Sequence, residues 1–500
     1  MILKFVEHQI LLHPYVTVFA VVFAIYYFLK RRRCTLPGPR GLPLIGCAPF
    51  LNRKRPWETY TELGHKHGAI FQVPIGPQIT VILNDLSVMQ EAMNKQVFAG
   101  RPKLLPLEIF SESGRSRFAF KTGNAQWHFL RKTARRSLSL FASSRNSKLQ
   151  KVVEESLKLF YKEIDSNLDV AWDPHPVIIK SVVGVIGSVL FGMDFDPDHP
   201  AILSFIDAVP IISGFFEKTA LAAFVPFRRF FFRKQIQDFL KAIEPTVTLS
   251  HPLILAKSPH VEGDEVRDVM EGLVKVASEL SPEERRQYNA TEENVKFIAE
   301  DLFGAGFATT TELFRWLLNL HAIFYEKQRK VHEELDKILD GQPAVVADEI
   351  KLPYLQASMT EVFRFASLIP LALPHSTMED VVFRGYFIPK DVVVFANLWG
   401  LHHDPNLFPD PFDFKPERFL KNGAINSELT QYVYPFGMGK RRCVGESLAR
   451  QELFLLFSRI MQRYAVEVAP GVQADPHASH PGLNRAPIRY PLVFRKRLQN

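Results

Sequence analysis

The chain of 500 residues is 47% hydrophobic and 23% charged, a composition that excludes disordered, collagen-like and disulfide-stapled proteins. Its 61 lysines and arginines outnumber its 53 aspartates and glutamates, but a net charge of +8 over this length is too dilute to indicate a nucleic-acid partner by itself. The three cysteines, Cys34, Cys47 and Cys443, are too few and too scattered for a disulfide framework, so we expect most of the chain in a reducing compartment.

An apolar segment near the N-terminus predicts a membrane anchor. Residues 10–29 are almost wholly apolar, and twenty helical residues span about 30 Å, the thickness of one hydrocarbon core. Lys30 and three arginines follow at once, and this basic flank predicts that the rest of the chain lies in the cytosol. We therefore expect a transmembrane helix and its basic stop over residues 1–33. A cleaved signal peptide is the alternative, but neither a positive n-region nor a small-residue cleavage site supports it.

A proline-rich stretch and one long body follow. Residues 34–46 hold three prolines and three glycines, which predict a stiff, turning hinge. No repeat or low-complexity tract divides residues 47–500, so we predict one catalytic domain there. It should be mainly α with a small β-sheet, with helices near 292–324, 326–339 and 446–461, a capped helix start at 281–284, and short strands at 79–83, 381–383 and 392–395.

Cys443 stands in a glycine-rich loop that is suited to hold a flat ligand. The loop reads Phe436-Gly-Met-Gly439-Lys-Arg441-Arg-Cys443-Val-Gly445 and leads into a predicted helix. The start of a helix offers free N–H donors and positive potential, which favour a thiolate. Gly439 and Gly445 let the backbone approach a flat ligand, and Arg441 can bind a carboxylate on it. A lone cysteine is more often a small buried hydrophobe, but these neighbours favour a chemical role.

This loop resembles the haem-binding loop of the cytochrome P-450 family, F-x-x-G-x-R-x-C-x-G, and the resemblance covers nearly the whole chain. It implies the cytochrome P-450 fold with an N-terminal transmembrane helix, haem b as the cofactor, and Cys443 as the axial thiolate ligand of its iron. Glu361 and Arg364 match the family's E-x-x-R, which the family pairs with the arginine of its P-E-R-F segment, Arg418, in a buried structural cluster. The residues that the resemblance implies around the cofactor are Trp127, Arg131, His375, Phe436, Gly439, Arg441 and Gly445. For His375, contact with substrate and a structural hydrogen bond stay open as alternatives.

The segment 301–310 resembles the family's helix on the oxygen side of the haem, A-G-x-[D/E]-T-T. Ala305 and Thr309 are four residues apart and face the same way on a helix. Glycine within a helix otherwise costs about 1 kcal/mol, so Gly304 and Gly306 are expected to open the groove where dioxygen sits. The resemblance gives Thr309 the task of hydrogen-bonding the bound oxygen or its waters and of relaying protons.

One residue departs from the family pattern. Ala308 stands where the family has an acid, and a methyl group cannot take protons from solvent and pass them on. Three interpretations stay open: water and Thr309 suffice, Asp301 two turns earlier substitutes for the acid, or the enzyme rearranges an already oxidised substrate. Asp301 has two other candidate tasks, contact with substrate and a local structural hydrogen bond.

The substrate pocket should be apolar. Its main candidates are Phe118, Phe307 and Leu371, with Asp301 as a polar neighbour. Further apolar candidates are Ile109, Phe110, Phe215, Phe216 and Ile369. The stretch 224–234 interleaves five aromatic residues with four cations, which is typical of a segment that touches a membrane surface; a base-stacking nucleic-acid platform is the weaker interpretation.

Within the family, the stretches 303–307, 373–377 and 397–403 look most like the animal microsomal group that includes aryl-hydrocarbon hydroxylases and steroid 17-alpha-hydroxylase. The resemblance implies a monooxygenase of the endoplasmic reticulum membrane, single-pass with a cytosolic catalytic domain, that oxidises a lipophilic compound with electrons from NADPH-cytochrome P-450 reductase. Whether cytochrome b5 assists stays open. The expected reductase-facing cations are Lys132, Arg135, Arg136, Lys440, Arg442 and Arg450. The alternatives are a reductase-independent isomerase or dehydratase acting on a peroxide, and a non-enzymatic haem-thiolate sensor or carrier.

Overall fold

The computed structural model describes Val18 and most of the chain from Cys34 to Arg497, namely residues 34–43, 45–76, 78–112, 118–143, 147–192, 196, 198–219, 228–256 and 266–497. The predicted membrane anchor over residues 1–33 therefore lies outside the described residues, apart from Val18. Across the described ranges, no helix is both long enough and apolar enough to cross a membrane.

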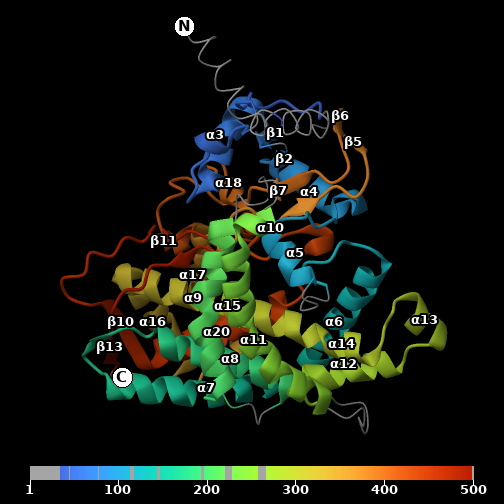
Figure 1. Ribbon diagram of the computed structural model, residues 1–500. Coiled ribbons are helices and arrows are strands. Elements are labelled where there is room, and N and C mark those ends of the chain that lie inside the picture. The colour runs from blue at the N-terminus through green and yellow to red at the C-terminus, as the bar shows by residue number, and fades with distance from the viewer. Residues whose placement is uncertain are drawn as a thin grey trace.

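A buried helix, α15 (Ile298–Ile323), lies at the centre of the helical body. It packs against α8 (His175–Phe191), α17 (Pro353–Ala366) and α20 (Glu446–Arg463), whose apolar side chains join those of α15 in the main core. Figure 1 shows α15, α8 and α20 together in the middle of the molecule. The mainly helical class predicted from the sequence is confirmed.

One predicted helix is divided into two in the structure, and the other predicted helix ends lie within two residues of the observed ones. The stretch predicted as one helix over 292–324 forms α14 (Glu292–Lys296) and α15, because the chain leaves the first helix before Phe297. The predicted capping box is formed: the Ser281 hydroxyl accepts from the Glu284 N–H, and the Glu284 carboxylate accepts from the Ser281 N–H. The Ser281 and Glu284 N–H groups, which have no backbone acceptor at the start of α13 (Pro282–Gln287), thereby gain hydrogen-bond partners.

The other helices surround this centre. They are α3 (Pro56–His67), α4 (Leu86–Asn94), α5 (Leu105–Glu112), α6 (Ala125–Ser143), α7 (Ser147–Ser166), α9 (Pro200–Thr219), α10 (Arg228–Phe231), α11 (Arg233–Ala256), α12 (Val269–Ser278), α16 (Tyr325–Leu339), α18 (Leu398–His402) and α19 (Ser427–Thr430). The predicted end of α16 is confirmed, since Asp340 takes a left-handed conformation (φ 46°) just after it.

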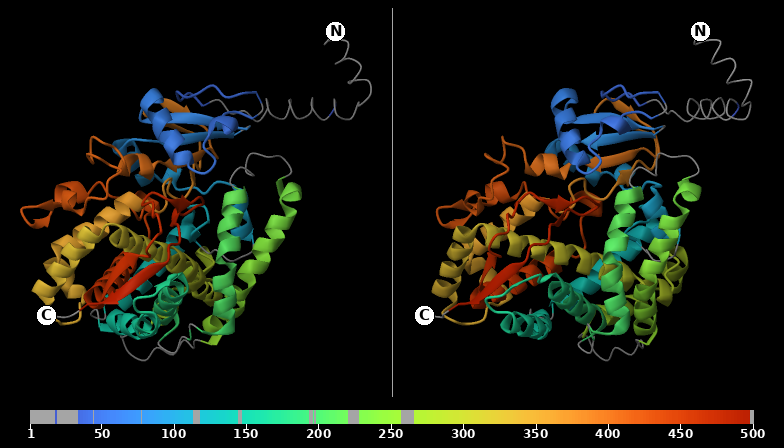
Figure 2. Two further views of the ribbon diagram at one scale, coloured as in Figure 1. Left: turned by 90° about the vertical axis from the view of Figure 1, so that its left-hand side faces the viewer. Right: turned by 60° about the vertical axis from the view of Figure 1, so that its left-hand side comes forward.

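The strands form small sheets at the margins of the helical body. The largest has the order β1-β2-β7-β4, and a three-stranded sheet has the order β10-β13-β3. Figure 2 shows the first of these sheets at one end of the molecule, where α3, α4 and α18 pack with it. The bounds are β1 (Ile70–Ile75), β2 (Gln78–Leu83), β3 (Ala171–Trp172), β4 (His375–Ser376), β7 (Val393–Ala396), β10 (Tyr464–Val468) and β13 (Leu492–Lys496), with two-stranded pairs β5 (Val381–Phe383) and β6 (Tyr386–Ile388), β8 (Leu420–Lys421) and β9 (Ala424–Ile425), and β11 (Ser479–His480) and β12 (Ala486–Pro487).

The described part of the predicted hinge is attached to the four-stranded sheet. The side-chain amide of Gln72 on β1 donates to the Leu36 carbonyl at 2.6 Å, and Gly46 pairs with Ile75 in an isolated bridge. Leu36 is buried in the apolar cluster of this sheet. Thr35 also exchanges hydrogen bonds with Phe387, so the described residues of the proline-rich stretch are attached to the folded body.

Candidate active site

Cys443 sits on a tight loop between a 3-10 turn (Gly439–Arg441) and α20. The Cys443 N–H donates to the Phe436 carbonyl at 2.9 Å and closes the loop. Gly439 has φ +68°, and a Cβ on it would lie 2.2 Å from the Met93 carbonyl oxygen on α4, so only glycine allows this approach. A Cβ on Gly445, at the start of α20, would lie 4.0 Å from the Cys443 sulfur. The loop thus holds the sulfur close to the beginning of a helix.

The start of α20 favours the thiolate as expected from the sequence, because the Gly445 N–H lowers the pKa of the Cys443 thiol, but other effects act against it. Burial raises the pKa of the Cys443 thiol, and the nearby Glu446 carboxylate raises it further. The Gly445 N–H and the cations Arg131 and Arg442 lower this pKa, but they do not offset burial. Cys443 is exposed among the described residues, so a positive partner such as a metal ion can reach its sulfur and favour the thiolate.

Beside the loop lies a cluster of cations around one indole ring. Trp127 on α6 is buried, and its Nε1 has no hydrogen-bond partner among the described residues. The guanidinium carbon of Arg441 lies 4.0 Å from the centre of this ring, and that of Arg131 lies 5.6 Å away. Arg131 also donates to the Arg442 carbonyl and so connects α6 with the cysteine loop. A buried donor without a partner, next to two cations, is suited to an anionic ligand.

A third cation completes this cluster, and the sequence analysis missed it. Arg101 is buried, and burial together with repulsion from Arg131 lowers its pKa to about 9. Burial and repulsion from Arg101 and Arg131 lower the pKa of Arg441 to about 8. The only signal in the sequence was an arginine placed shortly after the apolar pair Phe98 and Ala99. We call Arg101, Arg131 and Arg441 the arginine cluster, and its charge fits a ligand with carboxylates, such as the propionates of haem.

His375 lies on β4 next to the arginine cluster. Its Nδ1 lies 2.7 Å from the Phe98 carbonyl oxygen, so this ring nitrogen carries a proton and donates. Burial, Arg101 and Arg441 lower the pKa of His375 to about 3, so the ring is neutral at physiological pH. His375 is therefore held by the backbone in one tautomer and adds no charge to the cluster.

On α15, Ala305 and Thr309 share one face as expected. The Thr309 hydroxyl donates to the Ala305 carbonyl at 2.8 Å, and Ala305 is exposed. A Cβ on Gly304 would meet open space, whereas a Cβ on Gly306 would lie 2.9 Å from the Ile186 side chain on α8. The expectation that Gly306 opens a groove beside Thr309 is therefore wrong: this glycine lets α15 pack closely against α8.

The predicted substrate residues do not gather as a single apolar group. Phe307 is 4% exposed and packs on Phe303 in the main core, because it lies about 200° around the helix from Ala305. Phe118 belongs to the same core, and Leu371 packs against a different cluster near β1 and β2. Ile109 and Phe215 are buried together between α5, α9 and α11, and the side chains of Phe110 and Phe216 lie outside the described part. Phe307 thus faces the main core, and its place in the substrate pocket stays a prediction.

The three residues predicted as a structural cluster do come together. Two guanidinium nitrogens of Arg364 donate to the Glu361 carboxylate, at 2.7 and 2.8 Å, and Arg418 reaches it at 3.2 Å. The Lys415 N–H donates to the same carboxylate at 2.8 Å. The side chains of Glu361 and Arg364 are fully buried. This cluster fixes α17 to the turn Pro416–Phe419 that packs against it.

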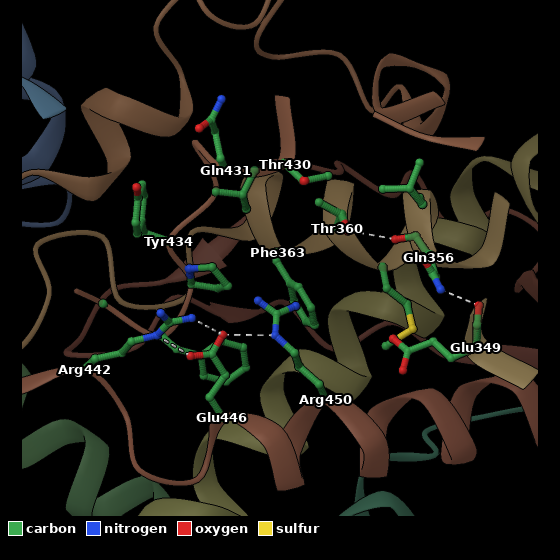
Figure 3. A pocket seen from close by; sticks show the side chains of 16 residues that line it. Glu349, Gln356, Thr360, Phe363, Thr430, Gln431, Tyr434, Arg442, Glu446 and Arg450 are labelled. Carbon is green, nitrogen blue, oxygen red and sulfur yellow. Dashed lines mark hydrogen bonds and ion pairs between the residues drawn. The ribbon is translucent and has the colours of Figure 1, made fainter. Parts of the chain in front are cut away.

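On the outer side of the cysteine loop, one carboxylate holds two of the predicted surface cations. Glu446 accepts from Arg442 at 2.6 and 2.9 Å and from Arg450 at 3.1 Å. Figure 3 shows this triad on the wall of a cavity of about 460 Å³, across from Glu349. Lys132, Arg135 and Lys440 lie outside this triad, and Arg136 pairs with Glu279 at 2.8 Å. The free positive charge beside the loop is thus smaller than the sequence indicates.

Known proteins resemble this chain in sequence and in fold. The family model of cytochrome P450 matches residues 36–494. Cytochrome P450 1A1 of Opsanus tau is 32% identical over 456 residues, which cover 88% of this chain and 87% of that protein. Cytochrome P450 1A5 of Gallus gallus is 31% identical over 458 residues, which cover 88% of this chain and 85% of that protein. A solved zebra fish cytochrome P450 structure with progesterone has a TM-score of 0.76 and 27% identity, and covers 88% of this chain and 99% of its own. The chain therefore belongs to the cytochrome P450 family and is a haem-thiolate monooxygenase.

Proposed function

We propose that the protein inserts one oxygen atom from O2 into a lipophilic substrate, with NADPH electrons and with Cys443 as the axial ligand of the haem iron. One observation carries this proposal: the Cys443 loop lies beside the arginine cluster. That cluster surrounds the indole ring of Trp127, whose nitrogen has no hydrogen-bond partner among the described residues. A thiolate ligand pushes electron density onto haem iron and favours cleavage of the O–O bond. Trp127, Arg131 and Arg441 would bind the haem propionates.

The described residues support a simple proton path on α15. Thr309 keeps its hydroxyl proton on the Ala305 carbonyl, which leaves the lone pairs of its oxygen free to accept from water. Ala308 supplies only a methyl group, which is partly buried against the main core. We infer that ordered water, positioned by Thr309, is the proton source. Since Ala308 is also compatible with chemistry that needs no protons, a peroxide isomerase or dehydratase remains the second candidate.

We infer a steroid or another polycyclic lipophile as the substrate class. The zebra fish cytochrome P450 that shares this fold was solved with progesterone, a steroid. The pocket candidates Phe118 and Leu371 are apolar, as a lipophilic substrate requires, although they lie in two separate clusters. Fatty acids and xenobiotics are the other lipophilic classes to screen.

We further propose that residues 1–33 anchor the protein in the endoplasmic reticulum membrane, with residues 34–46 as hinge and residues 47–500 as a cytosolic catalytic domain. Phe230 and Phe231 on α10 are 78% and 63% exposed beside several cations, as expected of a segment that contacts a lipid surface. NADPH-cytochrome P-450 reductase, and cytochrome b5 if it takes part, would dock at Lys132, Arg135 and Lys440.

A carbon monoxide difference spectrum of the reduced protein tests the shared premise. We expect a thiolate-type band in the wild type and its loss in Cys443→His. NADPH consumption with purified reductase then separates the candidates, because the monooxygenase consumes NADPH with substrate and the isomerase does not. A thiolate-type band that survives in Cys443→His would overturn the ligand assignment.

A further inference from the structure

Asp301 joins two segments that are far apart in the sequence. It lies in the first turn of α15, and its Oδ2 accepts from the Phe118 N–H at 2.8 Å and from the Ala119 N–H at 3.2 Å. Both donors belong to the loop before α6, more than 180 residues earlier in the chain. A carboxylate that accepts two backbone N–H groups forms strong, charge-assisted bonds. Asp301 therefore holds this loop against the helix that bears Thr309.

The same loop holds two members of the arginine cluster from its other side. The Ala119 carbonyl accepts from Arg101 at 3.1 Å, and the Lys121 carbonyl accepts from Arg441 at 2.6 Å. Arg101 also donates to the Pro374 carbonyl at 2.8 Å, next to His375. The segment 118–121 thus presents N–H groups to an anion and C=O groups to cations.

The two sets of bonds meet in one peptide group. The Ala119 N–H donates to Asp301, and the Phe118 carbonyl of the same peptide accepts from Arg441 at 3.5 Å, so these two interactions strengthen each other. Loss of the carboxylate would leave the Phe118 and Ala119 N–H groups without this acceptor in a largely buried region. The Ala119 and Lys121 carbonyls would then lose their fixed position, and each arginine would be oriented only by its other acceptor, Pro374 for Arg101 and Ala99 for Arg441.

We propose that Asp301 is a positioning residue that fixes segment 118–121 and, through it, the Arg101 and Arg441 side chains that would bind the haem propionates. The proposal rests on the proposed haem-thiolate function. It assigns Asp301 neither a proton-relay role nor a charge contact with substrate. What it requires is a side-chain oxygen acceptor, and asparagine provides one at the same distance from the backbone.

Hydrogen exchange of the haem-loaded, full-length protein tests this assignment directly. In Asp301→Ala we expect the amides of residues 118–121 to exchange at least about tenfold faster, which corresponds to about 1.4 kcal/mol. In Asp301→Asn we expect exchange within about threefold of the wild type. Glu334→Ala is the matched control, because it also removes a carboxylate from two backbone N–H groups, those of Tyr354 and Leu355. That control should leave exchange at 118–121 unchanged.

Haem transfer to an excess of apomyoglobin provides the second readout. Asp301→Ala should release haem several-fold faster than the wild type, and Asp301→Asn should release it at nearly the wild-type rate. Unchanged exchange and unchanged haem release in Asp301→Ala would overturn the proposal. So would an asparagine variant with normal exchange and haem release whose NADPH coupling collapses, because that result assigns Asp301 to proton delivery or substrate contact. The wild-type carbon monoxide spectrum tests the proposed function separately.

Discussion

Replacing Glu452 with glutamine should stabilise the protein by an amount that grows with pH. Glu452 lies on α20 and is 2% exposed, and its Oε1 has no hydrogen-bond partner among the described residues. Burial raises the pKa of this carboxyl to about 8. The folded state therefore keeps a proton that the unfolded chain releases near pH 4.5.

The sign of the effect follows from this difference in proton binding. Between about pH 4.5 and pH 8 the folded protein binds more protons than the unfolded chain, so stability falls as pH rises. Each pH unit in this range lowers the free energy of unfolding by about 1.36 kcal/mol. The total loss of stability therefore reaches at most roughly 4–5 kcal/mol at and above pH 8. Glutamine cannot ionise and has nearly the same shape, so the variant escapes this cost.

Urea unfolding of the haem-loaded protein at pH 5 and at pH 8.5 measures the effect. Glu452→Gln should differ little from the wild type at pH 5 and should unfold at clearly higher urea at pH 8.5. Glu62→Gln, an exposed carboxylate on α3, is the control and should show no pH-dependent gain. If Glu452→Gln raised the free energy of unfolding equally at both pH values, the reasoning would be refuted, because the gain would not depend on ionisation of Glu452.

Four further changes test other parts of the site. Glu361→Ala should destabilise the protein by about 3–5 kcal/mol, because it leaves buried guanidinium groups without a carboxylate; thermal unfolding measures this, and a loss below about 1 kcal/mol would contradict it. Gly439→Ala should abolish haem loading, since a Cβ there would lie 2.2 Å from a backbone oxygen; the haem content of the purified variant is the check. Ala308→Asp should improve coupling of NADPH to product if water now supplies the protons, and unchanged coupling would speak against that path. Lys132→Glu should slow reductase-supported turnover more than peroxide-supported turnover, and equal slowing would remove this residue from the docking surface.

Local rules predicted the elements with strong signals. The Ser281 capping box and the end of α16 were correct because a few neighbouring residues decide them. The cysteine loop was recognisable because its glycines and arginine recur at fixed spacing around Cys443. Gly439 is needed because the loop lies against α4, a reason that the sequence did not indicate, and its expected approach to a flat ligand stays a prediction.

Long-range packing decided what the sequence could not show. Gly306 faces Ile186 rather than open space, since the rotation of α15 is set by the helices that surround it. Arg101 was missed because nothing local distinguishes one buried arginine from the many exposed ones. The partners of Asp301 lie more than 180 residues away, so no periodicity in its own helix could reveal them.

The arginine cluster has a consequence for how the protein matures. Three like charges, two of them with a pKa lowered partly by mutual repulsion, converge where the chain folds around Trp127. An anionic cofactor that binds there relieves this repulsion only in the folded state, so it shifts the folding equilibrium by mass action. Cofactor supply should therefore control how much folded protein a cell accumulates, and haem-starved cells should contain less of it at the same rate of synthesis.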